Sequence, residues 1–183
     1  MNKSVFLDRD GVINNYPGCG KYVTGWKGFR FLPRVKDAIA QLTRAGFRIF
    51  VVSNQAGVNK GLFSKKDLDR LTRNMLCEIE KAGGRIDEVY YCVHRSDENC
   101  LCRKPKRGSL EAARKKYRVR LKGSFFIGDS MTDVLTAHNA GCASILVLSG
   151  SEKSSKRRSW DVQPDFIFRD LYQAVQFILS LDK

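Results

Sequence analysis

The chain of 183 residues is 43% hydrophobic and 28% charged, and it carries a formal net charge of +14. This length and composition predict one globular domain over residues 1–183 and exclude a disordered or fibrous chain. No apolar run approaches the length of a membrane span, and no signal peptide precedes the first strand-like run. We therefore expect no membrane partner. We also expect the protein to be a monomer and, from its cysteines, to be cytoplasmic.

The excess of positive charge, with 33 Lys and Arg against 19 Asp and Glu, has three interpretations. A sequence pI near 9.7 is typical of nucleic-acid-binding proteins. The same charge would attract a small, multiply phosphorylated substrate by electrostatic steering. In the third interpretation the cations only coat solvated helix faces, as in Arg114-Lys115-Lys116. Charge alone does not choose among the three.

Short apolar β-rich runs alternate with helical patterns along the chain. Strands are expected at Val5–Leu7, Arg48–Val52, Val89–Cys92, Phe125–Ile127, Ile145–Leu148 and Phe166–Phe168. Helices are expected at about 34–45, from Ser64 (with Asp67 as a capping box) to Gly83-Gly84, from Ser109, from Met131 to Gly141, and after Asp170. This order predicts an α/β fold: one Rossmann-like domain with a mostly parallel sheet, right-handed crossovers and helices on both faces.

In such a sheet, ligands bind beyond the carboxyl ends of the strands. Four expected strands are followed by polar loops at that end. These loops are Asp8-Arg9-Asp10-Gly11, Ser53-Asn54-Gln55, the stretch from Cys92 to Pro105, and Gly128-Asp129-Ser130. We expect all four to converge on one edge of the sheet. The segment 149–158, rich in Ser, Lys and Arg, is expected to be a mobile loop.

Asp8 and Asp10 are two positions apart at a strand end, so both carboxylates can face the same side. Paired carboxylates can ligate a metal, share a proton, or act as nucleophile and general acid. With Asp129 they offer the oxygen ligands that Mg²⁺ prefers, and Asp133, one helical turn further, can orient them. Asp-x-Asp-Gly alone indicates only a solvated turn, but four such loops in order favour a catalytic site.

Three further side chains at these strand ends suit a phosphate group. Ser53 and Asn54 can donate hydrogen bonds to phosphate oxygens, and Lys104 can neutralise charge on a carboxylate–phosphate centre.

The stretch 92–102 holds three of the six cysteines and one of the two histidines. Cys92, His94, Cys100 and Cys102 form C-x-H and C-x-C pairs separated by five polar residues, a set that suits tetrahedral Zn²⁺. Buried free thiols or a disulfide are the alternatives, but the polar spacer is unlike a core segment. Four protein ligands leave no open position, so the zinc is expected to be structural. We expect the adjacent Arg103 and Lys104 to bind an anion between them, as an anion clamp, and the zinc loop (residues 92–102) to fix their position.

The remaining cysteines receive no metal role. Cys77 and Cys142 lie in apolar contexts and are expected in the core, and thiol-rich clusters of this kind are typical of a reducing cytoplasm.

Four motifs in this order resemble those of the haloacid dehalogenase (HAD) phosphatases. They are Phe6-Leu7-Asp8-Arg9-Asp10-Gly11-Val12, Val52-Ser53-Asn54-Gln55, Arg103-Lys104-Pro105 and Ile127-Gly128-Asp129-Ser130-x-x-Asp133. The resemblance runs from about residue 4 to 150. The cysteine and histidine insert is similar to that of the zinc-containing branch without a large cap domain, which holds heptose-bisphosphate phosphatases and histidinol-phosphate phosphatases.

The resemblance implies a role for each matching position. Asp8 attacks phosphorus and forms an aspartyl phosphate; Asp10 is the general acid and then the base. Mg²⁺ is held by Asp8, Asp129 and the main-chain carbonyl of Asp10, with Asp133 and Ser130 behind them. Ser53 and Lys104 hold the phosphoryl group. Asn54, Arg103, Lys104 and Tyr22 lie where the family contacts substrate.

The function implied is a Mg²⁺-dependent phosphatase that removes the 7-phosphate of a heptose 1,7-bisphosphate in the synthesis of cell-surface polysaccharide. Histidinol-phosphate phosphatase and polynucleotide 3′-phosphatase are alternative enzymes, and a non-enzymatic zinc module that binds nucleic acid is a further one. The loop 15–21 is longer than in the heptose enzymes and lacks their His-Gly-Tyr sequence, and Ser130 replaces a common Lys. The resemblance therefore indicates the reaction more strongly than the substrate.

Overall fold

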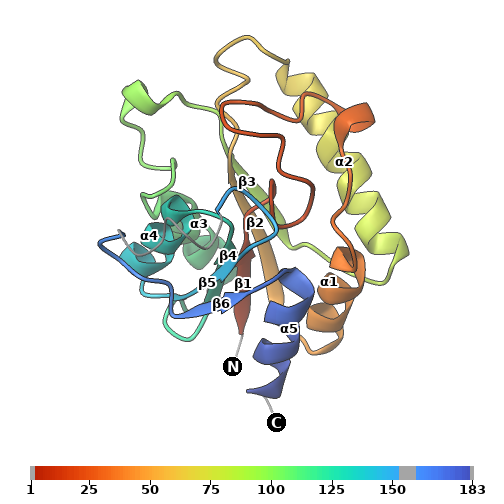
Figure 1. Cartoon of the computed structure of the whole chain (residues 1–183), viewed down its shortest axis with the longest axis vertical. Coiled ribbons are helices and arrows are strands. Elements are labelled where there is room, and N and C mark those ends of the chain that lie inside the picture. The colour runs from red at the N-terminus through yellow and green to blue at the C-terminus, as the bar shows by residue number, and fades with distance from the viewer. Residues whose placement is uncertain (1–2, 153–159, 182–183) are drawn as a thin grey trace.

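The computed structural model describes residues 3–152 and 160–181, in which strands and helices alternate (Figure 1). The strands are β1 (Ser4–Leu7), β2 (Arg48–Asn54), β3 (Glu88–Cys92), β4 (Phe125–Gly128), β5 (Ala143–Val147) and β6 (Phe166–Phe168). The α-helices are α1 (Val35–Arg44), α2 (Lys65–Lys81), α3 (Gly108–Tyr117), α4 (Met131–Ala140) and α5 (Leu171–Ser180). Two 3-10 turns, η1 (Trp26–Gly28) and η2 (Ser96–Glu98), lie in the loops.

The strands form one sheet in the order β3-β2-β1-β4-β5-β6. Each neighbouring pair is parallel, so the sheet in the described part of the chain is wholly parallel. Leu7 at the end of β1 pairs with Val51 of β2 and Ile127 of β4. The strand order reverses between β1 and β4, and this switch point is where α/β sheets bind ligands. Asp8, the next residue, therefore stands at the centre of the binding edge.

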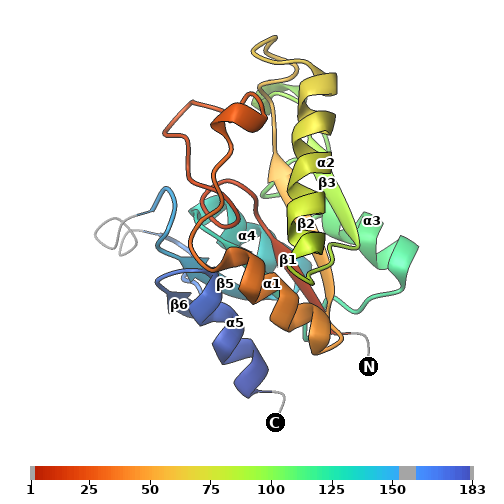
Figure 2. The ribbon, with the colours of Figure 1, turned by 90° about the vertical axis from the view of Figure 1, so that its right-hand side faces the viewer.

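The helices cover both faces of the sheet. Helices α1, α2 and α5 lie on one face, and α3 and α4 on the other (Figures 1 and 2). Because successive side chains of a strand point to opposite faces, β1 sends Val5 and Leu7 into the core under the first group and Phe6 into the core under the second. The Phe6 ring stacks on Phe50 at 5.2 Å between centroids. The described residues include no second, cap-like domain.

Local signals set the helix boundaries as the sequence predicts. The hydroxyl of Ser64 accepts from the Asp67 amide, and the Asp67 carboxylate accepts from the Ser64 amide, which is the capping box expected at the start of α2. Asp170 caps α5, and Gly141 ends α4 with φ +71°. The mainly apolar stripes of α1 and α2 are buried against the sheet. Six strands and five helices were expected in these places, and all are present in the described residues.

Three expectations need correction. Strand β5 begins at Ala143 and ends at Val147, so Leu148 is outside it. Cys77 is exposed, because it lies off the buried stripe of α2, whereas Cys142 is buried as expected. Of the segment 149–158 expected to be mobile, residues 153–158 lie outside the described residues, whereas Ser149, Ser151 and Glu152 are hydrogen-bonded to the loops that follow β1 and β4. None of the described helices is both long and apolar enough to span a membrane.

Candidate active site

A cleft of about 220 Å³ opens at the carboxyl edge of the sheet. Its lining residues come from the loops that contain the four motifs, from the segment before η1 and from the loop after β5. The lining residues are Asp8, Asp10, Tyr16, Pro17, Lys21, Tyr22, Ser53, Asn54, Lys104, Asp129, Ser130, Thr132 and Ser151. The structure therefore brings nearly all of the predicted catalytic and substrate residues together. Larger hollows occur elsewhere, such as one of about 610 Å³ beside α3, but none of their lining residues belongs to these motifs.

Asp8 holds one carboxylate oxygen fixed and leaves the other available. Its Oδ1 accepts from the Arg9 amide at 2.7 Å and lies 2.9 Å from Lys104 Nζ. Among the described residues no hydrogen bond reaches Oδ2. Burial raises the pKa of Asp8 to about 6, although Lys104 opposes the rise. A carboxylate oriented through one oxygen can attack an electrophile with the other.

Lys104 is a buried cation that joins two carboxylates. Its Nζ lies 2.6 Å from Asp133 Oδ1 as well as 2.9 Å from Asp8 Oδ1. Burial lowers the pKa of Lys104, but Asp133 and Asp8 together raise it well above the usual value. The ammonium therefore stays charged beside Asp8, where negative charge would gather during phosphoryl transfer.

Asp133 organises the end of β4 from behind. Its Oδ2 accepts from the amides of Asp129 and Ser130 at 3.2 and 3.1 Å, and from Ser130 Oγ at 2.6 Å. This is the capping box of α4. Since Oδ1 binds Lys104, both carboxylate oxygens of Asp133 are engaged by protein donors. Asp133 thus positions Asp129 and Lys104, in keeping with the orienting role expected for it and for Ser130.

Asp129 lies in a tight space between two glycines. A Cβ placed on Gly11 or Gly150 would come within 2.3 or 2.0 Å of Asp129 Oδ2. The Ser151 amide donates to that oxygen at 2.6 Å. Burial, reinforced by Asp133 and Asp8, raises the pKa of Asp129 to about 8.

The donor set at this edge fits a hard divalent cation. One oxygen each of Asp8, Asp129 and Asp133 lies within 4.8 Å of the others. Burial and the neighbouring carboxylates raise the pKa values of Asp8 and Asp129, and a bound cation would favour their charged forms. Since Asp133 is engaged by protein donors, Asp8 and Asp129 are the residues that would hold Mg²⁺. The Asp10 carboxylate lies outside this group, so any contribution from Asp10 would come from its main chain, as expected.

The Asp10 carboxylate is held by three side chains. Arg9 donates to both of its oxygens, at 3.0 and 2.9 Å from Nη2, Asn14 Nδ2 donates to Oδ1 at 2.8 Å, and Gln55 Nε2 donates to Oδ2 at 2.8 Å. Arg9 is fully buried, with Tyr91 against its guanidinium. Asp10 is therefore fixed at the cleft wall beside Asp8.

Ser53 and Asn54 end β2 in different environments. Ser53 Oγ accepts from Gln55 Nε2 at 3.2 Å, which leaves the hydroxyl proton for a ligand oxygen. Asn54 Oδ1 accepts from the Lys104 amide, and Asn54 Nδ2 donates to the Lys104 carbonyl, both at 3.1 Å. Asn54 was expected to contact substrate; its side chain also fastens the backbone of Lys104 to β2.

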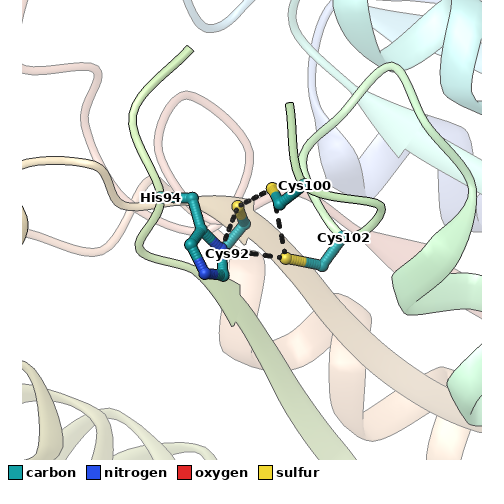
Figure 3. Close-up of side chains that lie close together, drawn as sticks. All are labelled: Cys92, His94, Cys100 and Cys102. Carbon is teal, nitrogen blue, oxygen red and sulfur yellow. Dashed lines mark hydrogen bonds between the residues drawn. The ribbon is translucent and has the colours of Figure 1, made fainter. Parts of the chain in front are cut away.

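The zinc ligands expected from the sequence form a compact cluster beyond the end of β3 (Figure 3). The Sγ atoms of Cys92 and Cys102 each lie 3.5 Å from that of Cys100, and His94 Nδ1 lies 3.7 Å from Cys92 and 3.3 Å from Cys102. Tetrahedral Zn²⁺ with bonds of about 2.3 Å needs sulfur atoms about 3.8 Å apart, whereas a disulfide needs about 2.05 Å. Burial raises the pKa of the Cys92 thiol to about 12, and metal binding would offset this cost. The cluster fits structural zinc.

The zinc loop also decides where Arg103 lies. Arg103 Nη1 donates to the His94 carbonyl at 3.1 Å, and Arg103 is not among the described residues that line the cleft. The structure therefore separates the expected clamp into Lys104, inside the cleft, and Arg103, against the loop. Tyr22 does line the cleft, and its ring contacts Phe63 at 6.1 Å between centroids.

Several functional residues were not singled out from the sequence. Arg9, Asn14 and Gln55 hold Asp10. Arg9 and Gln55 stand inside the motifs, and that position was the available signal in the sequence. Ser151 holds Asp129 and carries no motif signal, because its part comes only from the packing of its loop. Lys21 and Tyr16 line the cleft from the loop 15–21.

Known proteins are similar to this chain in both sequence and fold. Residues 101–174 match the HAD-hydrolase-like family model. A D-glycero-β-D-manno-heptose-1,7-bisphosphate 7-phosphatase from Helicobacter pylori is 36% identical over 148 residues, covering 80% of this chain and 84% of that protein. A D-glycero-α-D-manno-heptose-1,7-bisphosphate 7-phosphatase from Campylobacter jejuni is 34% identical over 182 residues, covering 98% of each.

A solved structure is similar to this chain over nearly its whole length. The D,D-heptose 1,7-bisphosphate phosphatase of B. bronchiseptica, complexed with magnesium and phosphate, superposes with a TM-score of 0.91 at 31% identity, covering 98% of this chain and 99% of that one. The fold and the sequence similarity are those of a HAD phosphatase, a phosphoric monoester hydrolase. At this identity and coverage, the chain belongs to the D-glycero-D-manno-heptose-1,7-bisphosphate 7-phosphatase family.

Proposed function

We propose that the protein hydrolyses the 7-phosphate of D-glycero-D-manno-heptose 1,7-bisphosphate through an aspartyl phosphate on Asp8. It acts as a cytoplasmic monomer and supplies heptose for the synthesis of cell-surface polysaccharide. The observation that carries the chemistry is the contact of Lys104 with Asp8 Oδ1, which orients the carboxylate of a residue that lines the cleft. The substrate comes from the relatives, whose names specify this bisphosphate.

In the first step, Asp8 Oδ2 attacks phosphorus, the bond from phosphorus to the sugar oxygen breaks, and Asp10 gives its proton to that oxygen. Both oxygens of Asp10 accept hydrogen bonds in this structure, so it must release a contact to present a proton. Lys104 and the Ser53 hydroxyl hold the phosphoryl oxygens. Mg²⁺, held by Asp8 and Asp129, would supply further charge neutralisation.

In the second step, water attacks phosphorus, and Asp10 accepts its proton. The acyl phosphate bond breaks, phosphate leaves and the Asp8 carboxylate is restored. These residues act mostly by positioning and by charge, as phosphoryl transfer requires.

The test is steady-state hydrolysis of both anomers of the heptose bisphosphate, because relatives that act on either are similarly identical to this chain. Histidinol phosphate and a 3′-phosphorylated oligonucleotide are the competing substrates. We expect Mg²⁺-dependent release of one phosphate, with kcat/KM on the bisphosphate at least about tenfold above the others. Comparable poor rates on all substrates would overturn the substrate assignment.

The variant Asp8→Asn distinguishes a phosphatase from a non-enzymatic module that binds nucleic acid. This variant should abolish turnover, while its far-UV circular dichroism spectrum and its zinc content stay as in the wild type. Near wild-type activity would refute the nucleophile. Nucleic-acid binding that weakens steeply with salt, together with phosphatase activity unaffected by Asp8→Asn, would favour the binding module.

A further inference from the structure

Lys21 is a cation at the cleft that the chemistry at Asp8 does not use. Three aspartates and two lysines, Lys21 and Lys104, are the charged residues among the described lining of the cleft. Lys104 is buried and already joins Asp8 to Asp133. Lys21 is exposed and makes no ion pair with any described residue. Its ammonium is thus available to a ligand.

The proposed substrate carries a second phosphate that does not react, and it needs a partner of its own. When the reacting phosphoryl group lies against Asp8 and Lys104, the other end of the sugar must extend toward the cleft mouth. Three carboxylates in the lining would repel this second dianion unless a cation stood nearby. Lys104 is enclosed at the base of the cleft and Arg103 does not line it, so Lys21 is the described cation in position.

The loop around Lys21 is folded to hold this lysine in place. Gly18 and Gly20 have φ of +105° and +70°, values that favour glycine, and the Lys21 amide donates to the Gly18 carbonyl at 3.1 Å. A Cβ on Gly18 would lie 3.5 Å from Lys21 Cδ, so the aliphatic stem lies against the turn. Part of the side chain's freedom is therefore lost before any ligand binds, which favours binding.

We propose that Lys21 binds the non-reacting phosphate of the bisphosphate and makes the enzyme prefer a bisphosphate to a monophosphate. This inference rests on the proposed function. This assigns a specificity role to the loop 15–21, which departs in length and sequence from the heptose-enzyme pattern.

The experiment measures kcat and KM on heptose 1,7-bisphosphate and on heptose 7-phosphate for the wild type and three variants. Lys21→Gln removes the charge, and Lys21→Arg restores it. Lys60→Gln is the matched control, because Lys60 Nζ lies 5.7 Å from the Tyr22 ring centroid without lining the cleft.

We expect Lys21→Gln to raise KM for the bisphosphate about 10- to 100-fold, the loss of one charge-assisted contact, and to change KM for the monophosphate less than about twofold. Lys21→Arg should recover most of the loss, and Lys60→Gln should change neither substrate.

Each outcome decides the matter. A wild-type preference for the bisphosphate that survives in Lys21→Gln overturns the role of Lys21 alone, as does an equal loss on both substrates. A wild type that hydrolyses both heptose phosphates equally well overturns this inference alone, whereas a wild type that hydrolyses neither overturns the proposed function.

Discussion

The Ser151 amide donates to Asp129 Oδ2 at 2.6 Å, across 22 positions of sequence. Ser151 Oγ also donates to the Asp129 carbonyl at 3.0 Å, so the loop after β5 is attached twice to the end of β4. Ser149 Oγ donates to the Gly11 carbonyl at 2.7 Å and links the same loop to the loop that follows β1. A segment without a motif therefore fixes a carboxylate that we expect to hold Mg²⁺.

Gly150→Ala should disrupt this arrangement by sterics alone. Its new Cβ would lie 2.0 Å from Asp129 Oδ2 and 2.4 Å from Asp129 Cβ, so the carboxylate or the loop must move. We expect kcat/KM to fall at least about tenfold and the Kd for Mg²⁺ to rise, since metal sites tolerate little displacement of a ligand. Kinetics at increasing Mg²⁺ measure both effects. Gly25→Ala is the control, because nothing lies within 4 Å of its Cβ. Unchanged Mg²⁺ affinity in Gly150→Ala would contradict the packing argument.

Asp133→Asn should reduce stability and turnover together. Asp133 is 1% exposed, and the substitution leaves the buried Lys104 without one of its two carboxylates. Breaking a buried pair by removing one partner costs about 3–5 kcal/mol of the free energy of unfolding. Urea denaturation measures that cost. Asp69→Asn, on the exposed face of α2, should cost less than about 0.5 kcal/mol. Equal midpoints for the two variants would show that Asp133 is not the anchor of this site.

The stabilisation by Mg²⁺ should grow with pH. Burial raises the pKa of Asp8 to about 6 and that of Asp129 to about 8 in the metal-free protein. A carboxyl whose folded pKa is raised favours folding while protonated, so the metal-free protein loses stability as pH rises from about 4 through these values. Mg²⁺ competes with those protons, and its affinity rises over the same window. The increase in Tm on adding Mg²⁺ should therefore be larger at about pH 8.5 than at about pH 5.5. An increase in Tm that is independent of pH, or one retained in Asp129→Asn, would contradict this assignment.

Cys100→Ser should weaken the zinc loop and, through it, the placement of Lys104. Removal of one of four ligands should release zinc and lower the free energy of unfolding by several kcal/mol. Activity should fall as well, because Arg103 is tied to the His94 carbonyl and Lys104 follows it directly. Zinc content, Tm and kcat/KM measured together test this chain of effects. Cys77→Ser is the matched control, since that thiol is exposed on α2. Full zinc content with unchanged kinetics in Cys100→Ser would show that the loop does not support the site.

The order and type of the elements could be predicted because the signals are local. A capping box at Ser64, a glycine at Gly141 and apolar runs of strand length each act within a few residues. Since parallel strands bring their carboxyl ends to one edge, the same pattern also places Asp8, Asp129 and Lys104 together. The four zinc ligands could be predicted because ligand type and spacing are properties of the chain itself.

The sequence by itself determined the α/β fold, the edge that binds ligands, and the donor sets for Mg²⁺ and Zn²⁺. Only the tertiary structure decided which neighbour each polar side chain binds. It placed Arg103 on the zinc loop, set Arg9, Asn14 and Gln55 around Asp10, and brought Ser151 to Asp129. The physical reason is the distance along the chain over which each signal acts: helix caps and hydrophobic periodicity determine structure only within one turn or one strand. A hydrogen bond between distant loops exists only after the sheet has set their separation, and the position of Lys21 at the cleft depends on that same packing.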